Sequence, residues 1–508
     1  MRGELKIENP WRYFSWVIIG AFGLLQLLRS VMLPQFMDMY YHLQVAWGFI
    51  QSGGYSGWDF WEYAPFGRPH IYPPFFHILL ALFMKLGFSA IFLAKFFESV
   101  TPVVFLIVIW DFVRKNYSEQ LGFFVVLAFC SAFAFFISLA NHVPAALALI
   151  FGLLGFSEFL KGRILRSAIL LALCFYTHIG SSWFFLLTFI FYALMEKDKR
   201  IQALKTVVFA LVAALPLFVQ QLQALGFMQA AGLDMHEKFL CQIKFVDYLL
   251  AFFGLFLVFK MPARYKFFVS LFLASLVFLS YPYRFFSGEG YLAVVFLSAI
   301  TLQEIWLRSK ACALTYRKII CGLLILFFLF ISPTLSLNKG VHAGKISYEL
   351  KWMDSALCGM IFAKGSTIWF PREYQPAVEA IKKNSLNTEI IYSNLNIVGP
   401  ILGSLAQRAT ANALLPEIGP KRQVPALEAA SIIVLTRDLD EGLVRNLSLK
   451  YGLVKIGESK IFQVFKNPTA LYTVKVSKPV VSFRMIIFIT ILVVGLFFAP
   501  ELAGIFKK

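Results

Sequence analysis

Residues whose types could carry chemistry are densest between positions 34 and 90. Asp38 stands beside Met39, Tyr40 and His42, a setting that leaves a carboxylate partly desolvated. Such a carboxylate can accept a proton from an incoming hydroxyl or amide, or ligate a hard cation. The structural alternative makes Asp38 the N-cap of a helix that begins at Met39 or Tyr40. We expect Asp38 to be catalytic and His42 to contact substrate.

Two further carboxylates, Asp59 and Glu62, follow in a turn-rich stretch that also holds Trp58 and Trp61. Aromatic rings match the apolar faces of hexoses, so this group predicts a sugar or metal site. Solvated loop carboxylates beside interfacial tryptophans are the alternative, because tryptophan is common at bilayer edges.

Cations suited to phosphate appear at Arg68, His70 and Arg284. Arginine presents a planar fork of donors that fits phosphate oxygens, although Arg284 could instead snorkel to the headgroups. His142 and His178 fall at helix ends, where an imidazole binds a ligand or satisfies a neighbouring carbonyl. The predicted substrate-binding residues are His42, Asp59, Glu62, Arg68, His70, His142, His178 and Arg284.

The elements that position these residues must be membrane helices. Of 508 residues, 59% are hydrophobic and 15% charged, whereas a soluble domain is apolar at roughly 45–50% of positions. Apolar runs of about 18 residues or more recur, each long enough to span a bilayer. The net charge of +19 arises in short basic loops beside helix ends, which is a topological pattern and not a nucleic-acid surface.

The charge pattern predicts a polytopic all-α transmembrane domain of about 12 helices with both termini inside. Apolar but short, 75–89 is predicted to be an interfacial helix rather than a span. The basic loops between the later helices are predicted to be cytoplasmic. The predicted spans lie near 14–33, 91–113, 121–139, 143–160, 166–179, 181–195, 204–221, 246–260, 266–281, 289–307, 318–335 and 483–499.

Three segments follow from this topology: a membrane domain at 1–336 with a large first outer loop at 34–90, a small extracytoplasmic α/β domain at 337–482, and a last helix with a basic cytoplasmic tail at 483–508. Within the α/β domain, AVEAIKKN and EGLVRNLSLKYG predict helices, whereas TEIIYSN, SIIVLTRD and KIFQVFK predict strands.

The six cysteines form no CxxC pair and predict no zinc site. A disulfide between Cys241 and Cys358, both placed outside, is left open. No HExxH, GxSxG or Walker motif occurs in a convincing context, which argues against a metalloprotease, a serine hydrolase and an ATP-driven pump.

The first outer loop resembles that of GT-C glycosyltransferases, above all the catalytic subunit of oligosaccharyltransferases and more loosely protein O-mannosyltransferases. The residues that carry the resemblance are Asp38-Met-Tyr-Tyr-His42, Trp58-Asp59, Trp61-Glu62, Pro65-Phe-Gly67-Arg68 and Pro73-Pro74. The sequence departs from the oligosaccharyltransferase pattern in two places. Its second outer loop, ANHVPA, has no carboxylate, and the WWDYG motif is missing, with only a faint likeness to it in Trp352-Met353-Asp354.

This resemblance implies transfer of a sugar from a polyprenyl-phosphate or polyprenyl-diphosphate carrier at the outer face. Asp38 would be the general base or the ligand of a divalent cation, Mg or Mn, and Arg284 would hold the carrier's phosphate. The implied partners are a lipid-linked donor, an acceptor of unknown class and the membrane, with no nucleic acid. The expected location is the cell membrane, with the active site outside.

Two other interpretations stay open. A polytopic transporter or lipid flippase would also have many spans and scattered polar residues, but it favours inverted repeats and polar groups at midplane, and no such repeat is evident. A non-catalytic scaffold or receptor would use the segment 337–482 to bind a partner.

Overall fold

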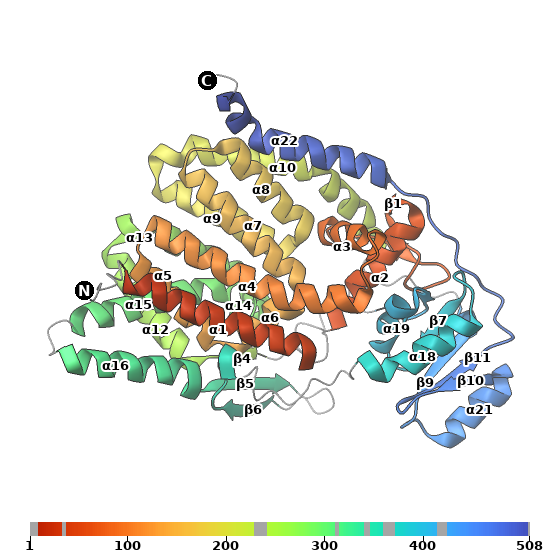
Figure 1. Cartoon of the computed structure of the whole chain (residues 1–508). Helices are drawn as coiled ribbons and strands as arrows, with labels where there is room; N and C mark the ends of the chain where they lie inside the picture. The colour runs from red at the N-terminus through yellow and green to blue at the C-terminus, as the bar shows by residue number, and fades with distance from the viewer. Residues whose placement is uncertain are drawn as a thin grey trace, which may run out of the picture. The chain divides into compact units, whose positions relative to one another are not determined.

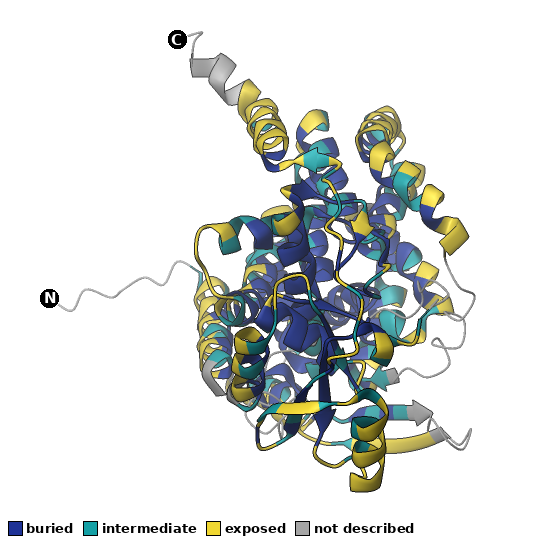
Figure 2. Ribbon diagram, turned by 90° about the vertical axis from the view of Figure 1, so that its right-hand side faces the viewer, coloured by how far each residue is buried: buried dark blue, intermediate teal, exposed yellow. Residues whose placement is uncertain are grey.

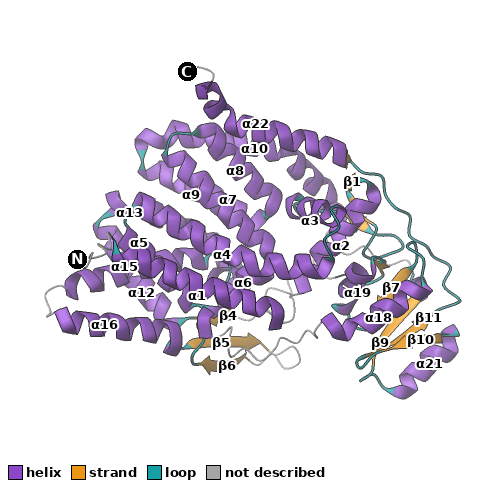
Figure 3. Cartoon of the chain, in the orientation of Figure 1, coloured by secondary structure: helices purple, strands orange, loops and turns teal. Residues whose placement is uncertain are grey.

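The computed structural model describes residues 9–32, 37–227, 241–309, 314–339, 346–358, 371–413 and 424–505. Helix dominates, and the longer strands are confined to two small sheets (Figure 3). The predicted basic ends, with Arg2, Lys6, Lys507 and Lys508, lie outside the described residues, as does Cys312.

Long apolar helices identify an integral membrane protein. Among the described residues, five helices are long and apolar enough to cross a bilayer, or six if the pair α5 (Glu119–Ser131) and α6 (Phe133–Asn141), bent by 82°, is one span. The five are Pro10–Ser30, Ala90–Asn116, Val143–Leu160, Lys197–Phe227 and Pro282–Arg308. The predicted polytopic helical architecture is confirmed at this level, whereas twelve spans with both termini inside stay a prediction.

Each predicted span is occupied by helix over most of its length. For example, α7 spans Val143–Leu160 as predicted, and a proline in its first turn suits the start of a helix. Some helices are short: α8 (Ile164–Thr177) has 14 residues, which reach about 21 Å at 1.5 Å per residue. The other helices at predicted spans are α1 (Pro10–Met32), α4 (Ala90–Asn116), α9 (Ile179–Met195), α10 (Arg200–Ala224), α12 (Phe245–Lys260), α13 (Pro262–Ser275), α15 (Tyr291–Arg308), α16 (Leu314–Leu326) and α22 (Phe483–Ile505).

The surface of these helices suits lipid. The helix α22 exposes apolar side chains around its circumference, among them Ile487, Phe488 and Leu492. Most of its ribbon is accordingly coloured as exposed in Figure 2. A helix that is hydrophobic all round belongs in an apolar surrounding, and here most of that surface is not covered by the chain itself.

By packing, the chain forms two compact units. Unit 1 comprises Met1–Met32, Ser99–Ala214 and Asp234–Lys364, and unit 2 comprises Leu33–Glu98, Leu215–Leu233 and Gly365–Lys508. These units group residues by contact, whereas the predicted domains 1–336, 337–482 and 483–508 group them by side of the membrane, so the predicted domain limits stay a prediction.

Unit 1 contains an antiparallel sheet that the sequence did not predict. Its strands run in the order β4 (Cys241–Ile243), β5 (Thr334–Lys339) and β6 (Ile346–Lys351). The predicted helix 318–335 is therefore wrong at its end: after α16 a π-helical turn, Phe327–Ile331, closes the helix, and β5 begins at Thr334.

In unit 2, a five-stranded mixed sheet forms the C-terminal module, in the order β10-β11-β9-β7-β8. The helix α21 covers one face, packing near Ile433 and Phe465, and α18 packs on the other, where Tyr374 contacts Phe462 (Figure 1). The predicted mixture of helix and strand is confirmed. Its elements are α18 (Pro371–Asn384), β7 (Ile390–Ser393), α19 (Val398–Ala406), β8 (Ala409–Thr410), α20 (Ala426–Ala429), β9 (Ile432–Thr436), α21 (Glu441–Tyr451), β10 (Val454–Glu458) and β11 (Phe462–Lys466).

The predicted first outer loop also belongs to unit 2. It consists of α2 (Met37–Ser52), β1 (Gly54–Tyr55), β2 (Trp58–Asp59), β3 (Arg68–Pro69) and α3 (Phe75–Lys85). At 11 residues, α3 reaches only about 17 Å, too short to span, in keeping with the predicted interfacial helix. The strand β1 pairs with β12 (Val481–Ser482).

Candidate functional site

Asp38 lies in the first turn of α2 and is partly exposed. The helix begins at Met37, so Asp38 is inside the helix rather than its N-cap. A carboxylate there is stabilised by the positive end of the helix dipole. Residues 39–49 of α2 are all buried, including His42 and Gln44, so this helix fixes the backbone that carries Asp38.

Histidines pack beneath α2. His42 Nδ1 and His77 Nε2 lie 2.8 Å apart, both buried. The ring of His70 lies 5.5 Å from that of His77 between centroids. Burial, with the neighbouring His42 and His70 adding to it, holds the pKa of His77 well below its usual value. His77 is not among the residues predicted from the sequence. The signal that could have suggested it is its position four residues after Pro73, in the first turn of the predicted interfacial helix.

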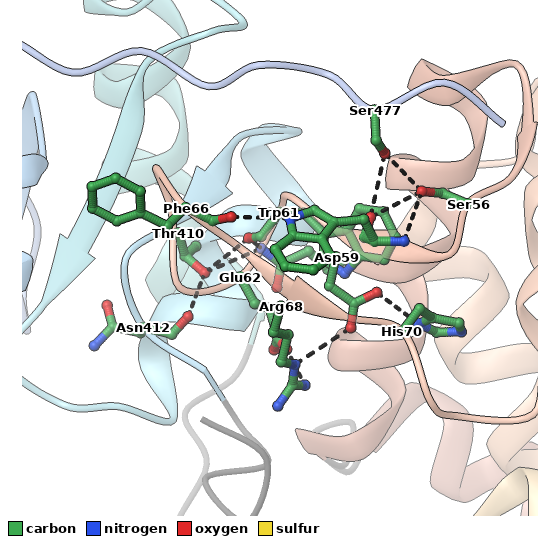
Figure 4. A network of polar contacts seen from close by, with 12 residues as sticks. Ser56, Asp59, Trp61, Glu62, Phe66, Arg68, His70, Thr410, Asn412 and Ser477 are labelled. Atoms are coloured by element: carbon green, nitrogen blue, oxygen red, sulfur yellow. Dashed lines mark hydrogen bonds and ion pairs between the residues drawn. The ribbon is translucent and has the colours of Figure 1, made fainter. Parts of the chain in front are cut away.

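The carboxylates and cations of the first loop meet in one ion network (Figure 4). Arg68 Nε lies 3.4 Å from Asp59 Oδ2, and the same guanidinium pairs through Nη2 with Glu62. His70 Nδ1 lies 2.6 Å from Asp59 Oδ1. All four side chains are at most 2% exposed.

The chain brings this network together through a short hairpin in which Asp59 stands opposite Arg68. Gly67, at φ +71°, makes the turn, and a Cβ there would lie 2.5 Å from Trp58 Nε1. Burial lowers the pKa of the Arg68 guanidinium, but Glu62, Tyr41 and the other partners outweigh it and hold that pKa above its usual value. Arg68 is therefore charged, and the network acts as a scaffold for the loop. Whether its members also bind substrate stays a prediction.

Backbone pairing joins the first loop to the module. Thr410 N–H donates to Trp61 O at 2.8 Å, and Ala64 N–H donates to Thr410 O at 3.0 Å. The segment 61–64, itself a turn, is thereby hydrogen-bonded to β8 at the edge of the sheet. Gln44 Nε2 of α2 donates to the same Trp61 carbonyl at 2.9 Å, so the helix of Asp38 and the module share one anchor.

Unit 1 holds a second group of predicted residues. Arg284, on the short helix α14 (Pro282–Phe286), places Nη1 2.9 Å from Glu289 Oε1. His178 Nδ1 lies 3.5 Å from the same oxygen. Arg284 is about a third exposed, whereas Glu289 is 7% exposed, so a buried carboxylate orients a guanidinium that reaches the surface. His142 joins the group through Tyr283, with ring centroids 6.1 Å apart.

Close backbone approach makes this arrangement possible. A Cβ at Gly180 would lie 2.5 Å from Arg284 Nη1, so glycine leaves the space that the guanidinium occupies. Glu289 is also absent from the residues predicted from the sequence. An isolated acidic residue between apolar helices is the signal that would have found it, because a charge at membrane depth is costly unless it is paired.

Two predictions about ligands have different outcomes. The disulfide left open between Cys241 and Cys358 is not formed, because Cys358 is a free, buried thiol whose Sγ donates to Leu329 O at 3.3 Å. Among the described residues, no group of three or more His, Cys, Asp or Glu side chains is placed to hold a metal ion. Asp38 as a ligand of Mg or Mn stays a prediction.

No protein-family model and no curated protein matches the chain. Solved structures do match. The archaeal oligosaccharyltransferase AglB from Archaeoglobus fulgidus, in complex with an inhibitory peptide and a dolichol-phosphate, is 11% identical at a TM-score of 0.54, over 86% of this chain and 71% of that one. ArnT from Cupriavidus metallidurans, bound to undecaprenyl phosphate, is 13% identical at a TM-score of 0.51, over 90% of this chain and 98% of that one.

A second structure of the A. fulgidus oligosaccharyltransferase, in complex with Zn and sulfate, gives 12% identity and a TM-score of 0.55, over 86% of this chain and 69% of that one. At such identities the likeness establishes the fold. AglB and ArnT are both GT-C membrane glycosyltransferases, so the predicted resemblance is confirmed at the level of the fold.

Proposed function

We propose that this chain, which has the GT-C fold, is a glycosyltransferase that moves a sugar from a polyprenyl-phosphate or polyprenyl-diphosphate carrier to an acceptor on the extracytoplasmic side of the membrane. The observation that carries the proposal is the extent of the likeness to ArnT, which takes in 90% of this chain and 98% of that one. A fold hosts more than one chemistry, so the side chains must supply the rest of the argument.

Asp38 is the proposed general base. The acceptor's hydroxyl or amide attacks the anomeric carbon of the donor while its proton passes to the Asp38 carboxylate. The bond between the anomeric carbon and the phosphate oxygen breaks, and the electron pair leaves with the carrier's phosphate. Attack opposite the leaving group inverts the anomeric centre, and a nearby carboxylate stabilises the oxocarbenium-like charge. The partial exposure of Asp38 at the start of α2 supports this role, because an acceptor must reach it.

Arg284 is the proposed partner of the leaving phosphate. Its guanidinium is about a third exposed and is held from behind by Glu289, which is 7% exposed. A planar donor fork fixed by a buried carboxylate is well prepared for an anion, since little side-chain freedom is lost on binding. AglB was solved with dolichol-phosphate and ArnT with undecaprenyl phosphate, which favours a carrier of the same class here.

His178 and His142 are proposed to bind the donor beside Arg284. His178 contacts Glu289, and His142 reaches the group through Tyr283. In unit 2, the buried network of Asp59, Glu62, Arg68 and His70 is proposed to act on catalysis by positioning α2.

The test is transfer by the purified chain in nanodiscs. A panel of polyprenyl phosphates, each bearing a radiolabelled hexose, is supplied with membrane extract as acceptor. We expect the wild type to move label from carrier to acceptor, and Asp38→Asn, in a folded protein, to leave it on the carrier. Near-normal turnover by Asp38→Asn would remove that residue from the mechanism. Passage of the intact donor across liposomes without any transfer would instead support a flippase.

A further inference from the structure

The three-stranded sheet of unit 1 has two faces of different character. In an antiparallel pair, residues directly opposite each other lie on the same face. Leu335 is opposite both Leu350 and Ile243, and Leu337 is opposite Tyr348. These five residues form one face, here called the outer face. Thr334 and Ser336 alternate with the leucines and point to the other side.

Burial on the middle strand of this sheet is the reverse of that in a soluble protein. On β5, Thr334 and Ser336 are 1% and 4% exposed, whereas Leu335 and Leu337 are only partly buried. The edge strand β6 is exposed on both faces, with Tyr348 at 80% and Leu350 at 52% on the outer face and Glu349 at 69% on the other. Antiparallel sheets with one solvated face place apolar residues inward and polar residues outward. On β5 the hydroxyls face inward, and on β6 the exposed side chains are apolar on the outer face and charged on the other. This difference between the faces indicates that the outer face meets an apolar surrounding.

The sheet is tied to the ends of two apolar helices. Ser332 and Pro333 alone separate β5 from the π-helical turn that ends at Ile331, and Lys244 alone separates β4 from α12. Lys244 Nζ donates to Ser332 O at 2.8 Å, so the two connections between helix and sheet are held together. Figure 1 shows β4, β5 and β6 beside α16 and α12.

Both helices expose large apolar side chains up to the point where the sheet begins. Phe330 and Ile331 are exposed at the end of the turn after α16, and Phe245 is exposed at the start of α12. The outer face of the sheet continues this apolar surface. Trp352, directly after β6, is exposed too, and tryptophan and tyrosine are the residues enriched at bilayer interfaces.

We propose that the outer face of the β4-β5-β6 sheet lies in the headgroup region of the bilayer, with Tyr348, Leu350 and Trp352 in contact with lipid. The neighbouring charges fit this position, because Glu349 and Lys351 alternate with the apolar residues and form an ion pair of 3.6 Å. Binding of an acceptor peptide would not explain this pattern. A peptide that adds to a sheet pairs with the backbone at the edge of a strand such as β6, whereas the exposed apolar side chains lie on one face of the sheet. The proposal does not depend on glycosyl transfer.

Nitroxide labels on adjacent residues test this placement. Tyr348→Cys and Leu350→Cys put a label on the outer face, and Glu349→Cys provides the matched control on the other face of the same strand. Each full-length variant is labelled in nanodiscs, with the unmodified chain labelled in parallel to measure the background from the six native cysteines. Collision rates are measured with oxygen, which concentrates in lipid, and with a water-soluble nickel chelate.

The proposal expects the labels at 348 and 350 to collide several-fold more with oxygen than with nickel, and the label at 349 to show the reverse preference. Equal access of nickel to positions 348 and 349 would overturn it, because the outer face would then be in water. Protection of 348 and 350 from both reagents would overturn it too, in favour of a protein partner or a second copy of the chain.

Discussion

Arg284 and Glu289 form an ion pair of 2.9 Å in which the carboxylate is buried and the guanidinium is partly exposed. Four residues separate them, and the turn between them includes Gly288, where a Cβ would lie 2.8 Å from the Arg284 Cα. The pair therefore depends on a compact turn that larger residues would open.

Replacement of Arg284 should weaken donor binding. Arg284→Ala removes charged hydrogen bonds that contribute about 1.5–3 kcal/mol each. Because the guanidinium is partly exposed, we expect the KM for the polyprenyl-phosphate donor to rise about 10-fold. Steady-state transfer kinetics give the value. Arg437→Ala is the matched control, since Arg437 also pairs with a glutamate, Glu458, but on the exposed surface. An unchanged donor KM in a folded Arg284→Ala protein would separate Arg284 from the phosphate.

Replacement of Asp38 should act on kcat. General base catalysis contributes about 10²–10⁴-fold, so we expect Asp38→Asn to lower kcat by that factor with little change in the donor KM. Asp198→Asn is the control, because Asp198 is an exposed aspartate in the turn Lys197–Lys199. A large rise in the donor KM with kcat intact would instead assign Asp38 to binding.

Replacement of Arg68 should act on stability. Arg68→Ala leaves Asp59 and Glu62 buried without their common cation, and loss of one partner from a buried pair costs about 3–5 kcal/mol. We expect a lower free energy of unfolding in detergent, whereas Arg437→Ala should cost about 1 kcal/mol or less. A stable Arg68→Ala protein with a raised KM for either substrate would show that the network binds substrate instead.

Substitutions at Gly67 and Gly53 should distinguish the cost of backbone strain from the cost of steric crowding. Both have positive φ, but a Cβ at Gly67 lies 2.5 Å from Trp58 Nε1 and 2.6 Å from Asp59 O, and nothing lies within 4 Å at Gly53. Gly53→Ala should cost about 1 kcal/mol of strain, and Gly67→Ala about 2 kcal/mol more from overpacking. Thermal unfolding measures both. Equal losses would mean that the hairpin gives way at little cost.

The buried His77 should make the free energy of unfolding sensitive to acid. Burial lowers the pKa of His77 in the folded state, while the unfolded chain titrates near 6.5. Below about pH 6.5 the unfolded state binds more protons, so stability is lost as the pH falls from 6.5 towards the folded pKa. His77→Asn should flatten this dependence between about pH 6.5 and 5. An unchanged slope in the variant would assign the acid sensitivity to other groups.

The sequence predicted the helices because hydropathy is a local property. The helix at 143–160 and the strands at Ile390–Ser393 and Ile432–Thr436 each follow from their own residues. The sheet of unit 1 did not, because Cys241–Ile243 is short and pairs with a strand from far along the chain. The leucines of β5 also follow closely on the apolar residues of the π-helical turn after α16, so hydropathy alone does not separate this strand from the helix before it.

The candidate site was predicted as residue types but not as pairs. The sequence predicts Arg68, Asp59, Glu62 and His70 each as a separate substrate ligand, whereas the hairpin register places them against one another. Charge pairing between residues several positions apart depends on turn geometry. The role of Glu289 could not be predicted for the same reason, because this residue pairs with Arg284 only through the fold of α14 and the turn that follows.

The hydrogen bonds between Trp61 and Thr410 join positions 349 residues apart. The strand β1 likewise pairs with β12, which is synthesised much later. During synthesis the first loop leaves the ribosome long before the module does. The backbone edge of the loop must therefore stay unpaired during most of synthesis. Conversely, the module expressed by itself would lack the segment 61–64 beside β8. The isolated module would therefore expose the backbone edge of β8 that residues 61–64 cover in the full chain.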